Sequence, residues 1–95
     1  MKQPAIYIMS NRKNGAVYTG VTSGLVKRVY EHKEGIIKGF TFRYKCKSIV
    51  YYELFDTMYD AITREKQLKA GSRDKKVALI NSMNSDWRDL YLDII

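Results

Sequence analysis

Apolar and aromatic residues recur along this chain in short runs whose spacing changes from that of strands to that of helices. The segments 5–9 and 16–22 are rich in isoleucine, valine, tyrosine and threonine, and the stretch 10–15 between them carries serine, asparagine and glycine, which favour turns. Together they predict a β-hairpin. The near-continuous apolar run 48–55 predicts a third strand, buried at the centre of a sheet.

The loop of this hairpin determines how Tyr7 and Tyr18 are placed. Because side chains alternate between the two faces of a strand, an even-length loop puts both rings on the same face. A four-residue loop over 11–14 would set the rings directly opposite each other, whereas a tight turn at Asn14-Gly15 would displace them by about 13 Å along the strands. We expect the four-residue loop, because paired phenols make chemical sense.

Helical spacing begins directly after the second predicted strand. Thr22 or Ser23 offers a hydroxyl that can cap a helix, and Gly35 has the conformational freedom that ends one. We therefore predict a helix over 25–33.

Two polar residues accompany the apolar stripe of this helix. Leu25 and Val29 form the stripe, Arg28 lies three residues after Leu25, and His32 lies three residues after Val29. Both polar side chains therefore flank the buried stripe and can reach across a face of the sheet.

Two further helices are predicted after the third strand. Asp56 or Thr57 caps the first, while the second begins near Ser72, after a break at Gly71, and is ended by residues 84–86. The first helix carries an apolar stripe with one acidic position, made of Met58, Ala61, Ile62, Glu65 and Leu68. A chain of 95 residues suits a single domain over 1–95 with one modest core.

Charge narrows the class of partner. The sequence holds 17 lysine and arginine residues against 10 acidic ones, a formal net charge of +7. This balance suits nucleic acid, although a basic protein without such a partner is the plainer alternative. The stretch 35–47 interleaves basic and aromatic residues and predicts a long loop that contacts ligands. The basic side chains expected to contact nucleic acid are Lys27, Lys33, Lys38, Arg43, Lys45, Lys69 and Arg73.

Composition also excludes or disfavours several kinds of site. Cys46 is the only cysteine, so no internal disulfide can form and a reducing cytoplasmic setting is expected. His32 is the only histidine, which excludes multi-histidine zinc sites, and the glycines match no nucleotide-binding fingerprint. No apolar run is long enough for a signal peptide or a membrane span, so no membrane partner is expected.

Glu65 carries the strongest individual signal, because a carboxylate on a core-facing stripe is costly unless positive charge compensates it. A structural ion pair with Arg28 or a lysine would provide that charge. The alternative is a divalent metal. One carboxylate is too few for a calcium cage but suits Mg²⁺ or Mn²⁺, which keeps waters and takes phosphate oxygens from a substrate.

The other polar candidates each have a chemical and a structural interpretation. The Arg28 guanidinium can hold a phosphate oxygen as negative charge builds, or lie at the surface without a role. His32 can accept or relay a proton near neutral pH, or serve the structure. Tyr7 and Tyr18 ordinarily pack, and a phenol with a pKa of about 10 needs positive charge or a metal-bound water before it acts as a base.

Six polar residues follow one another in chain order: Tyr7, Tyr18, Arg28, His32, Glu65 and Asn84. This ordered set resembles the GIY-YIG nuclease family over essentially the whole chain. The segments 18–22, 28–33, 64–67 and 84–87 are similar to small stand-alone bacterial members and to the N-terminal nuclease module of the bacterial excinuclease. Two positions depart from the family pattern: Ala5 replaces the glycine of the first motif and Thr19 the isoleucine of the second. Neither removes a reactive group.

The resemblance implies an α+β fold in which a three-stranded antiparallel sheet is flanked by helices. This agrees with the β-β-α-β-α-α order predicted from the pattern. It also implies roles for individual residues. Glu65 would be the metal ligand and Arg28 the phosphate stabiliser.

The resemblance gives the remaining residues supporting roles. Tyr7 or Tyr18 would help to activate or position the attacking water, and which of them is the base stays open. His32 would orient or assist a phenol, and Asn84 would support the site by hydrogen bonds.

We therefore expect a Mg²⁺- or Mn²⁺-dependent endonuclease that hydrolyses DNA, or RNA, with little sequence preference and with binding that weakens steeply in salt. The likeness to the excinuclease module implies DNA repair as one setting, and a protein partner would supply targeting. One alternative is a nucleic-acid-binding module that keeps the site but does not cut. Another is an adaptor whose aromatic loop binds protein.

Overall fold

Three antiparallel strands form the centre of the computed structural model, which describes residues 2–95. They are β1 (Ala5–Ser10), β2 (Val17–Thr22) and β3 (Ser48–Leu54), in the spatial order β2-β1-β3. The central strand is therefore β1, and the prediction that 48–55 lies at the centre is wrong. The apolar run of β3 arises because helices pack on both faces of an edge strand: Ile49 is buried on one face and Val50 on the other.

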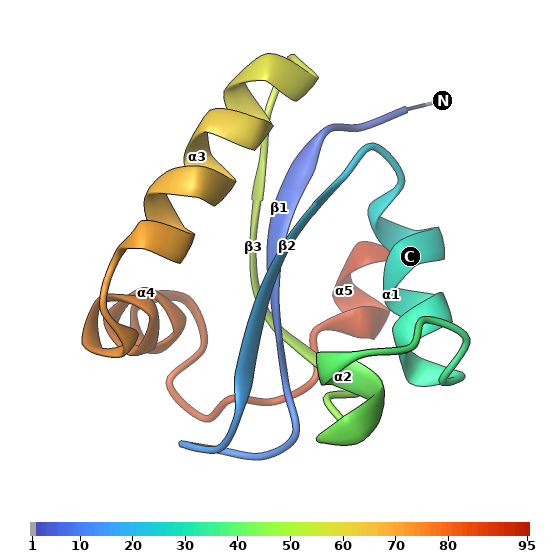
Figure 1. Ribbon diagram of the computed structural model, residues 1–95, viewed down its shortest axis with the longest axis vertical. Coiled ribbons are helices and arrows are strands. Elements are labelled where there is room, and N and C mark those ends of the chain that lie inside the picture. Colours follow the sequence, from blue (N-terminus) through green and yellow to red (C-terminus); the bar gives the residue numbers. More distant parts are fainter. Residues whose placement is uncertain (1) are drawn as a thin grey trace.

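Within residues 2–95, five helices cover the sheet: α1 (Leu25–Lys33), α2 (Phe40–Arg43), α3 (Met58–Ala70), α4 (Arg73–Asn84) and α5 (Tyr91–Ile94). Figure 1 shows α3 and α4 on one face and α1, α2 and α5 on the other. The α+β class and the order of the strands and longer helices are confirmed. The short helix α2 lies in the segment predicted as a loop, and the short helix α5 follows the last predicted helix. None of the helices in the described part is long and apolar enough to cross a membrane.

Alternation along β1 divides the apolar interior into two cores. Tyr7 and Met9 face α1 and pack with Val29, whereas Ile6 and Ile8 face α3 and α4. All of these side chains are fully buried, and each large apolar one contributes roughly 1.5–3 kcal/mol to folding. The central strand is thus held from both sides, which gives Tyr7 a fixed position.

The ends of α1 agree only partly with the prediction. Its N-cap is Gly24. Thr22 instead accepts a hydrogen bond from the Gly24 N–H at 3.0 Å, so the predicted cap at Thr22 or Ser23 is wrong. Gly35 ends the helix as predicted, with a φ of +71° that an L side chain rarely adopts.

The predicted cap at Thr57 and the predicted start of a helix near Ser72 are confirmed. Their hydroxyls accept backbone N–H bonds from the residues three positions on, at 3.1 and 3.3 Å. On α3, Ala61 and Leu68 are buried as predicted, whereas Ile62 is 37% exposed. The stripe is therefore narrower than the sequence suggested.

The hairpin register places Tyr7 opposite Gly20 and Tyr18 opposite Met9. Both rings lie on the same face of the sheet, as predicted. They are diagonal neighbours, however, and the prediction that they face each other directly is wrong.

The cause of this register is a loop of six residues, 11–16, where four were expected. The side-chain oxygen of Asn11 accepts the Ala16 N–H at 3.0 Å, which takes Ala16 out of the strand pairing. Inside the loop, Asn14 has a φ of +59°, which asparagine tolerates better than most residues.

Candidate active site

Tyr7, His32 and Thr41 form a buried chain of hydrogen bonds that joins three elements. The hydroxyl of Tyr7, on β1, lies 2.9 Å from Nε2 of His32, on α1. Nδ1 of the same imidazole lies 2.9 Å from the Thr41 hydroxyl, on α2. Less than 5% of each of the three residues is exposed, so water does not compete for these bonds.

Burial sets the protonation of the first two groups. Burial and the neighbouring phenol of Tyr18 raise the pKa of Tyr7 to about 12, against the opposing effect of the Arg28 guanidinium. Burial and Arg28 lower the pKa of His32 from its ordinary 6.5, and the carboxylate of Glu31 only partly opposes them. At neutral pH a protonated phenol therefore faces a neutral imidazole.

These protonation states determine the direction of both bonds. A neutral imidazole has one donor and one acceptor nitrogen. Because Tyr7 keeps its proton, its O–H donates to Nε2 of His32, and the Nδ1–H then donates to Thr41. Thr41 thus holds the tautomer that can accept a proton from the phenol.

Tyr18 lies beside this chain and is half-buried. Its ring centroid is 6.5 Å from that of Tyr7 and 5.8 Å from that of His32. Lys69, on α3, places its ammonium 5.7 Å from the centroid of the same ring. Tyr18 therefore lies between the buried chain of hydrogen bonds and the charged groups of α3.

Glu65 enters this region from α3. Its carboxylate lies 3.2 Å from the Lys69 ammonium, one helical turn away, and its side chain is 16% exposed. Its charge also contributes to the raised pKa of Tyr7, though less than burial does. The lysine alternative for its ion pair is therefore correct, but such an (i, i+4) pair is worth only roughly 0.3–0.5 kcal/mol. A pair this weak leaves the Glu65 carboxylate able to exchange Lys69 for another cation.

Arg28 supplies positive charge at the edge of the same region. Its guanidinium pairs with Glu31 at 3.5 Å, and its side chain is 41% exposed. It affects the pKa of both Tyr7 and His32. An exposed guanidinium beside the buried phenol can bind an anionic oxygen brought by a substrate.

The carboxylates restrict the metals that this site can hold. No three His, Cys, Asp or Glu side chains within 2–95 are grouped as a metal cage. Glu65 is therefore part of no such cage, and its carboxylate does not fit structural zinc or calcium. It fits Mg²⁺ or Mn²⁺, because these ions keep several waters and bind phosphate oxygens.

Gly20 belongs to the site although the sequence pattern gave it no role. A Cβ at this position would lie 2.4 Å from both Cζ and the hydroxyl oxygen of Tyr7. The phenol therefore lies directly over the backbone of β2. A glycine inside a predicted strand is a signal of such close approach and could have identified this position. Thr41 had no comparable signal.

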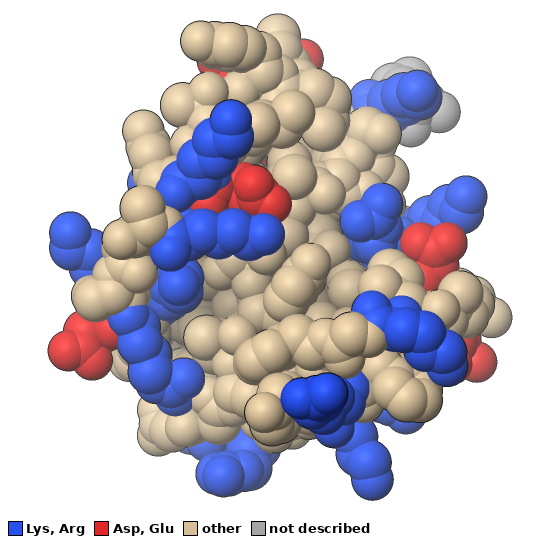
Figure 2. All heavy atoms as spheres, in the orientation of Figure 1, with Lys and Arg blue, Asp and Glu red and all other residues tan. Residues whose placement is uncertain are grey.

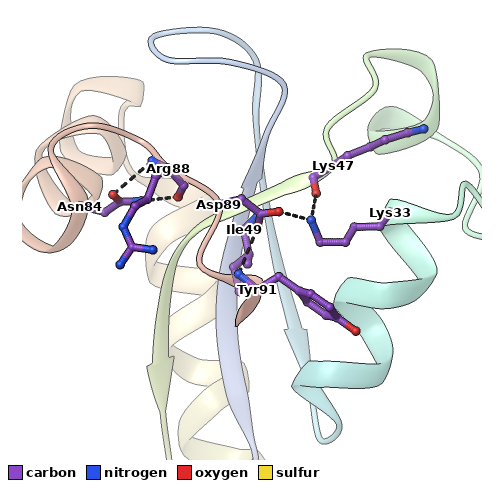
Figure 3. A network of polar contacts seen from close by, with 7 residues as sticks. All are labelled: Lys33, Lys47, Ile49, Asn84, Arg88, Asp89 and Tyr91. Atoms are coloured by element: carbon purple, nitrogen blue, oxygen red, sulfur yellow. Dashed lines mark hydrogen bonds and ion pairs between the residues drawn. The ribbon is translucent and has the colours of Figure 1, made fainter. Parts of the chain in front are cut away.

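Asn84 does not join these groups, although it was predicted to support them. It ends α4, where its amide nitrogen donates to the backbone oxygens of Val50, at 3.2 Å, and Arg88, at 2.7 Å. Its oxygen accepts the Arg88 N–H at 3.2 Å (Figure 3). The side chain thus fastens the end of α4 to the edge strand β3.

Lys33 has a similar structural position, although it was predicted to contact nucleic acid. Its ammonium donates to the Lys47 backbone oxygen at 2.9 Å and pairs with Asp89. Figure 3 shows this carboxylate also accepting the backbone N–H groups of Ile49 and Tyr91. Lys33 therefore connects α1 to the last segment of the chain.

The other basic residues differ in how much of their charge faces solvent. Lys27, Arg43, Lys45 and Arg73 are all exposed, but Arg73 also donates to the backbone oxygens of residues 14 and 15 and holds the hairpin loop. Figure 2 shows lysine and arginine side chains gathered over α3 and over the segment that carries α2, with a mostly uncharged surface between them. This surface can receive the backbone of a nucleic acid.

Comparisons with known proteins identify relatives of this chain. Residues 3–78 match the family model described as the GIY-YIG catalytic domain. The UPF0213 protein SSP2268 of Staphylococcus saprophyticus is 37% identical over 81 residues, which are 85% of this chain and 98% of that protein. The UPF0213 protein CPE1444 of Clostridium perfringens is 34% identical, over 81% of this chain and 82% of that protein.

A solved structure shares the fold. The solution NMR structure of the UPF0213 protein BH0048 from Bacillus halodurans superposes with a TM-score of 0.55 at 23% sequence identity, and the match covers 92% of both chains. The similarity confirms the three-stranded sheet flanked by helices.

Proposed function

The chain belongs to the GIY-YIG family, whose members are endonucleases, and on this premise we propose that it hydrolyses phosphodiester bonds of DNA with the help of Mg²⁺ or Mn²⁺. The observation that carries the proposal is the buried Tyr7–His32 hydrogen bond of 2.9 Å, close to the charges of Arg28 and Glu65. A protonated phenol next to a neutral imidazole is an arrangement that can receive a proton from water.

The proton pathway favours His32 over Tyr7 as the final base. With a pKa of about 12, Tyr7 is ionised in only about one molecule in 10⁵ at pH 7. As water attacks phosphorus, its proton passes to the Tyr7 oxygen while the phenol proton passes to Nε2 of His32. Tyr7 is protonated before and after the step, and His32 becomes the cation. The anionic substrate stabilises that cation.

Arg28 stabilises the negative charge of the phosphate directly, and Glu65 does so through a divalent ion. The Arg28 guanidinium binds a non-bridging oxygen and stabilises the negative charge that grows in the transition state. Glu65 would hold the divalent ion, which, when bound, supplies Lewis-acid charge to the phosphate and its leaving oxygen. Tyr18, half-buried beside Tyr7, positions the attacking water.

The substrate would be held mainly through its backbone. The exposed lysines and arginines around the site contact phosphates and carry no base information, so we expect little sequence preference. Affinity should be on the order of 10⁻⁴–10⁻⁶ M and should fall steeply as salt increases. We place the enzyme in the cytoplasm, where the single thiol of Cys46 would stay reduced.

Nicking of supercoiled plasmid by the purified chain tests the proposal. With Mg²⁺, the wild type should convert supercoiled DNA to open circles, and Glu65→Gln and Arg28→Ala should reduce the rate by at least about 10²-fold. Glu34→Gln, which removes the same charge from an exposed position on the end of α1, should cut like the wild type. Salt-dependent binding without nicking in either metal would contradict the proposal and favour a module that binds but does not cut.

A further inference from the structure

The segment that carries α2 exposes aromatic rings that the proposed chemistry does not use. Phe40, Phe42 and Tyr44 are 43%, 51% and 46% exposed. With Gly39 and Arg43 they line an open hollow of about 520 Å³. We call Phe40, Phe42 and Tyr44 the aromatic platform. Exposed rings gathered in one place indicate a surface that a partner covers.

The platform is continuous with the candidate active site. Phe40 stacks on Tyr18 with a distance of 6.2 Å between ring centroids and an interplanar angle of 26°. The ring centroid of Tyr44 lies 4.7 Å from that of Phe40. A row of rings therefore leads from Tyr18 outward across α2. Thr41, between these rings in sequence, is the residue that holds His32.

The charges around the platform indicate the chemistry of its partner. Residues 35–47 contain four basic residues and no acidic one. Arg43 and Lys45 are exposed, and the Lys38 ammonium lies 3.9 Å from the centroid of the Phe42 ring. Flat apolar surfaces alternating with cations suit a ligand that carries both π-faces and negative charge.

We propose that the aromatic platform stacks the unpaired bases of a single-stranded stretch next to the bond that is cut. The proposal rests on the nuclease function proposed above, and it names the substrate as DNA with single-stranded character. In a duplex the bases are stacked on one another and offer no free face to Phe40 or Tyr44, whereas an unpaired base does. The cations beside the rings contact the phosphates between those bases.

Binding measured without metal tests this preference independently of cleavage. Labelled DNA of one sequence is presented to the full chain in EDTA as a single strand, a blunt duplex and a duplex with a single-stranded overhang, and fluorescence anisotropy gives each affinity. The single strand and the overhang should bind at least about tenfold more tightly than the blunt duplex, since stacking contributes about 1–3 kcal/mol per base. Equal affinity for all three would overturn the proposal, whether or not the protein cuts.

Two variants separate stacking from charge. Phe40→Leu/Tyr44→Leu keeps apolar side chains but removes the ring faces, and it should bind the single strand about tenfold less tightly while binding the duplex unchanged. Arg43→Gln/Lys45→Gln should weaken both and reduce the salt dependence by roughly one ion for each lost contact. Tyr59→Leu, which removes a 79% exposed ring from α3, is the matched control and should bind like the wild type.

A base analogue reports the contact directly. Strands carrying 2-aminopurine should lose fluorescence when they bind the wild type, because stacking on an aromatic ring quenches it, and this loss should disappear in Phe40→Leu/Tyr44→Leu. Circular dichroism confirms that the variant is folded, and Tyr44→Leu alone provides the same test with less effect on α2. A strand that binds with full affinity to the folded variant would overturn the assignment.

Discussion

The hydroxyl of Thr41 lies 2.9 Å from Nδ1 of His32, so the segment that carries the aromatic platform also orients the imidazole of the candidate active site. The other ring nitrogen of His32 lies 2.9 Å from the Tyr7 hydroxyl. A movement of α2 caused by a bound strand would therefore reach the proton pathway through one hydrogen bond.

Replacing Thr41 by valine should separate this positioning role from binding. Valine has nearly the same shape but leaves the buried Nδ1–H of His32 without an acceptor, which costs about 1–3 kcal/mol of stability. The tautomer that accepts the Tyr7 proton is then no longer favoured. We expect the single-turnover cleavage rate to fall about tenfold with unchanged DNA affinity, and Thr41→Ser to restore it. A rate that stays at the wild-type level would mean that Thr41 only fills space.

Gly20→Ala should displace Tyr7. The new Cβ would lie 2.4 Å from the phenol oxygen, closer than atoms can approach, so the ring must shift from the position in which its hydroxyl meets His32. We expect a loss of about 1–3 kcal/mol of stability and about 10²-fold in cleavage.

Gly24→Ala is the matched control for this substitution. Its Cβ would meet no atom within 4 Å, and its φ of −139° is accessible to alanine. It should therefore cut at the wild-type rate. If the two variants behave alike in cleavage, the close contact between Tyr7 and Gly20 has no role.

The lowered pKa of His32 predicts how stability changes with pH. In the unfolded chain this imidazole takes up a proton near pH 6.5, whereas burial and Arg28 delay protonation in the folded state. The unfolded state therefore binds more protons just below pH 6.5, and stability is lost as the pH falls through that value. Urea unfolding between pH 7.5 and about 5 should show this loss for the wild type. His32→Gln should show a smaller slope, and parallel curves for the two proteins would contradict the prediction.

Asn84→Ala should affect the fold and leave the chemistry intact. The substitution removes one hydrogen bond from the end of α4 to Val50 on β3 and two to the backbone of Arg88, so the free energy of unfolding should fall by about 1–3 kcal/mol. Cleavage per folded molecule, measured well below the melting temperature, should equal that of the wild type. A larger loss in cleavage than the unfolded fraction explains would return Asn84 to the catalytic site.

Local sequence signals predicted the elements well because they act over a few residues. The hydroxyls of Thr57 and Ser72 begin helices where they were expected, and Gly35 ends α1 with the positive φ that glycine permits. The family resemblance, and not the periodicity of the chain, grouped the polar residues as one predicted site. The structure places Tyr7, Tyr18, Arg28, His32 and Glu65 close together, and their roles stay predictions that the variants test.

The features that the sequence did not predict depend on contacts between distant residues or on one side-chain bond. The hydrogen bond from the Ala16 N–H to the Asn11 side chain lengthens the hairpin loop, so that Tyr7 lies opposite Gly20 and not opposite Tyr18. The position of β3 at the edge depends on the pairing order, which an apolar run does not reveal. Lys33 is paired to Asp89, 56 residues away, and so composition alone made it look available for nucleic acid.

The most direct test of the account is the single-turnover cleavage rate of Tyr7→Phe with Mg²⁺. This substitution keeps the ring in the core and removes only the hydroxyl that lies 2.9 Å from His32. The account predicts a rate at least about 10²-fold below that of the wild type, at equal DNA affinity, because the proton of the attacking water loses its path to the imidazole. Cleavage by Tyr7→Phe at the wild-type rate would contradict it.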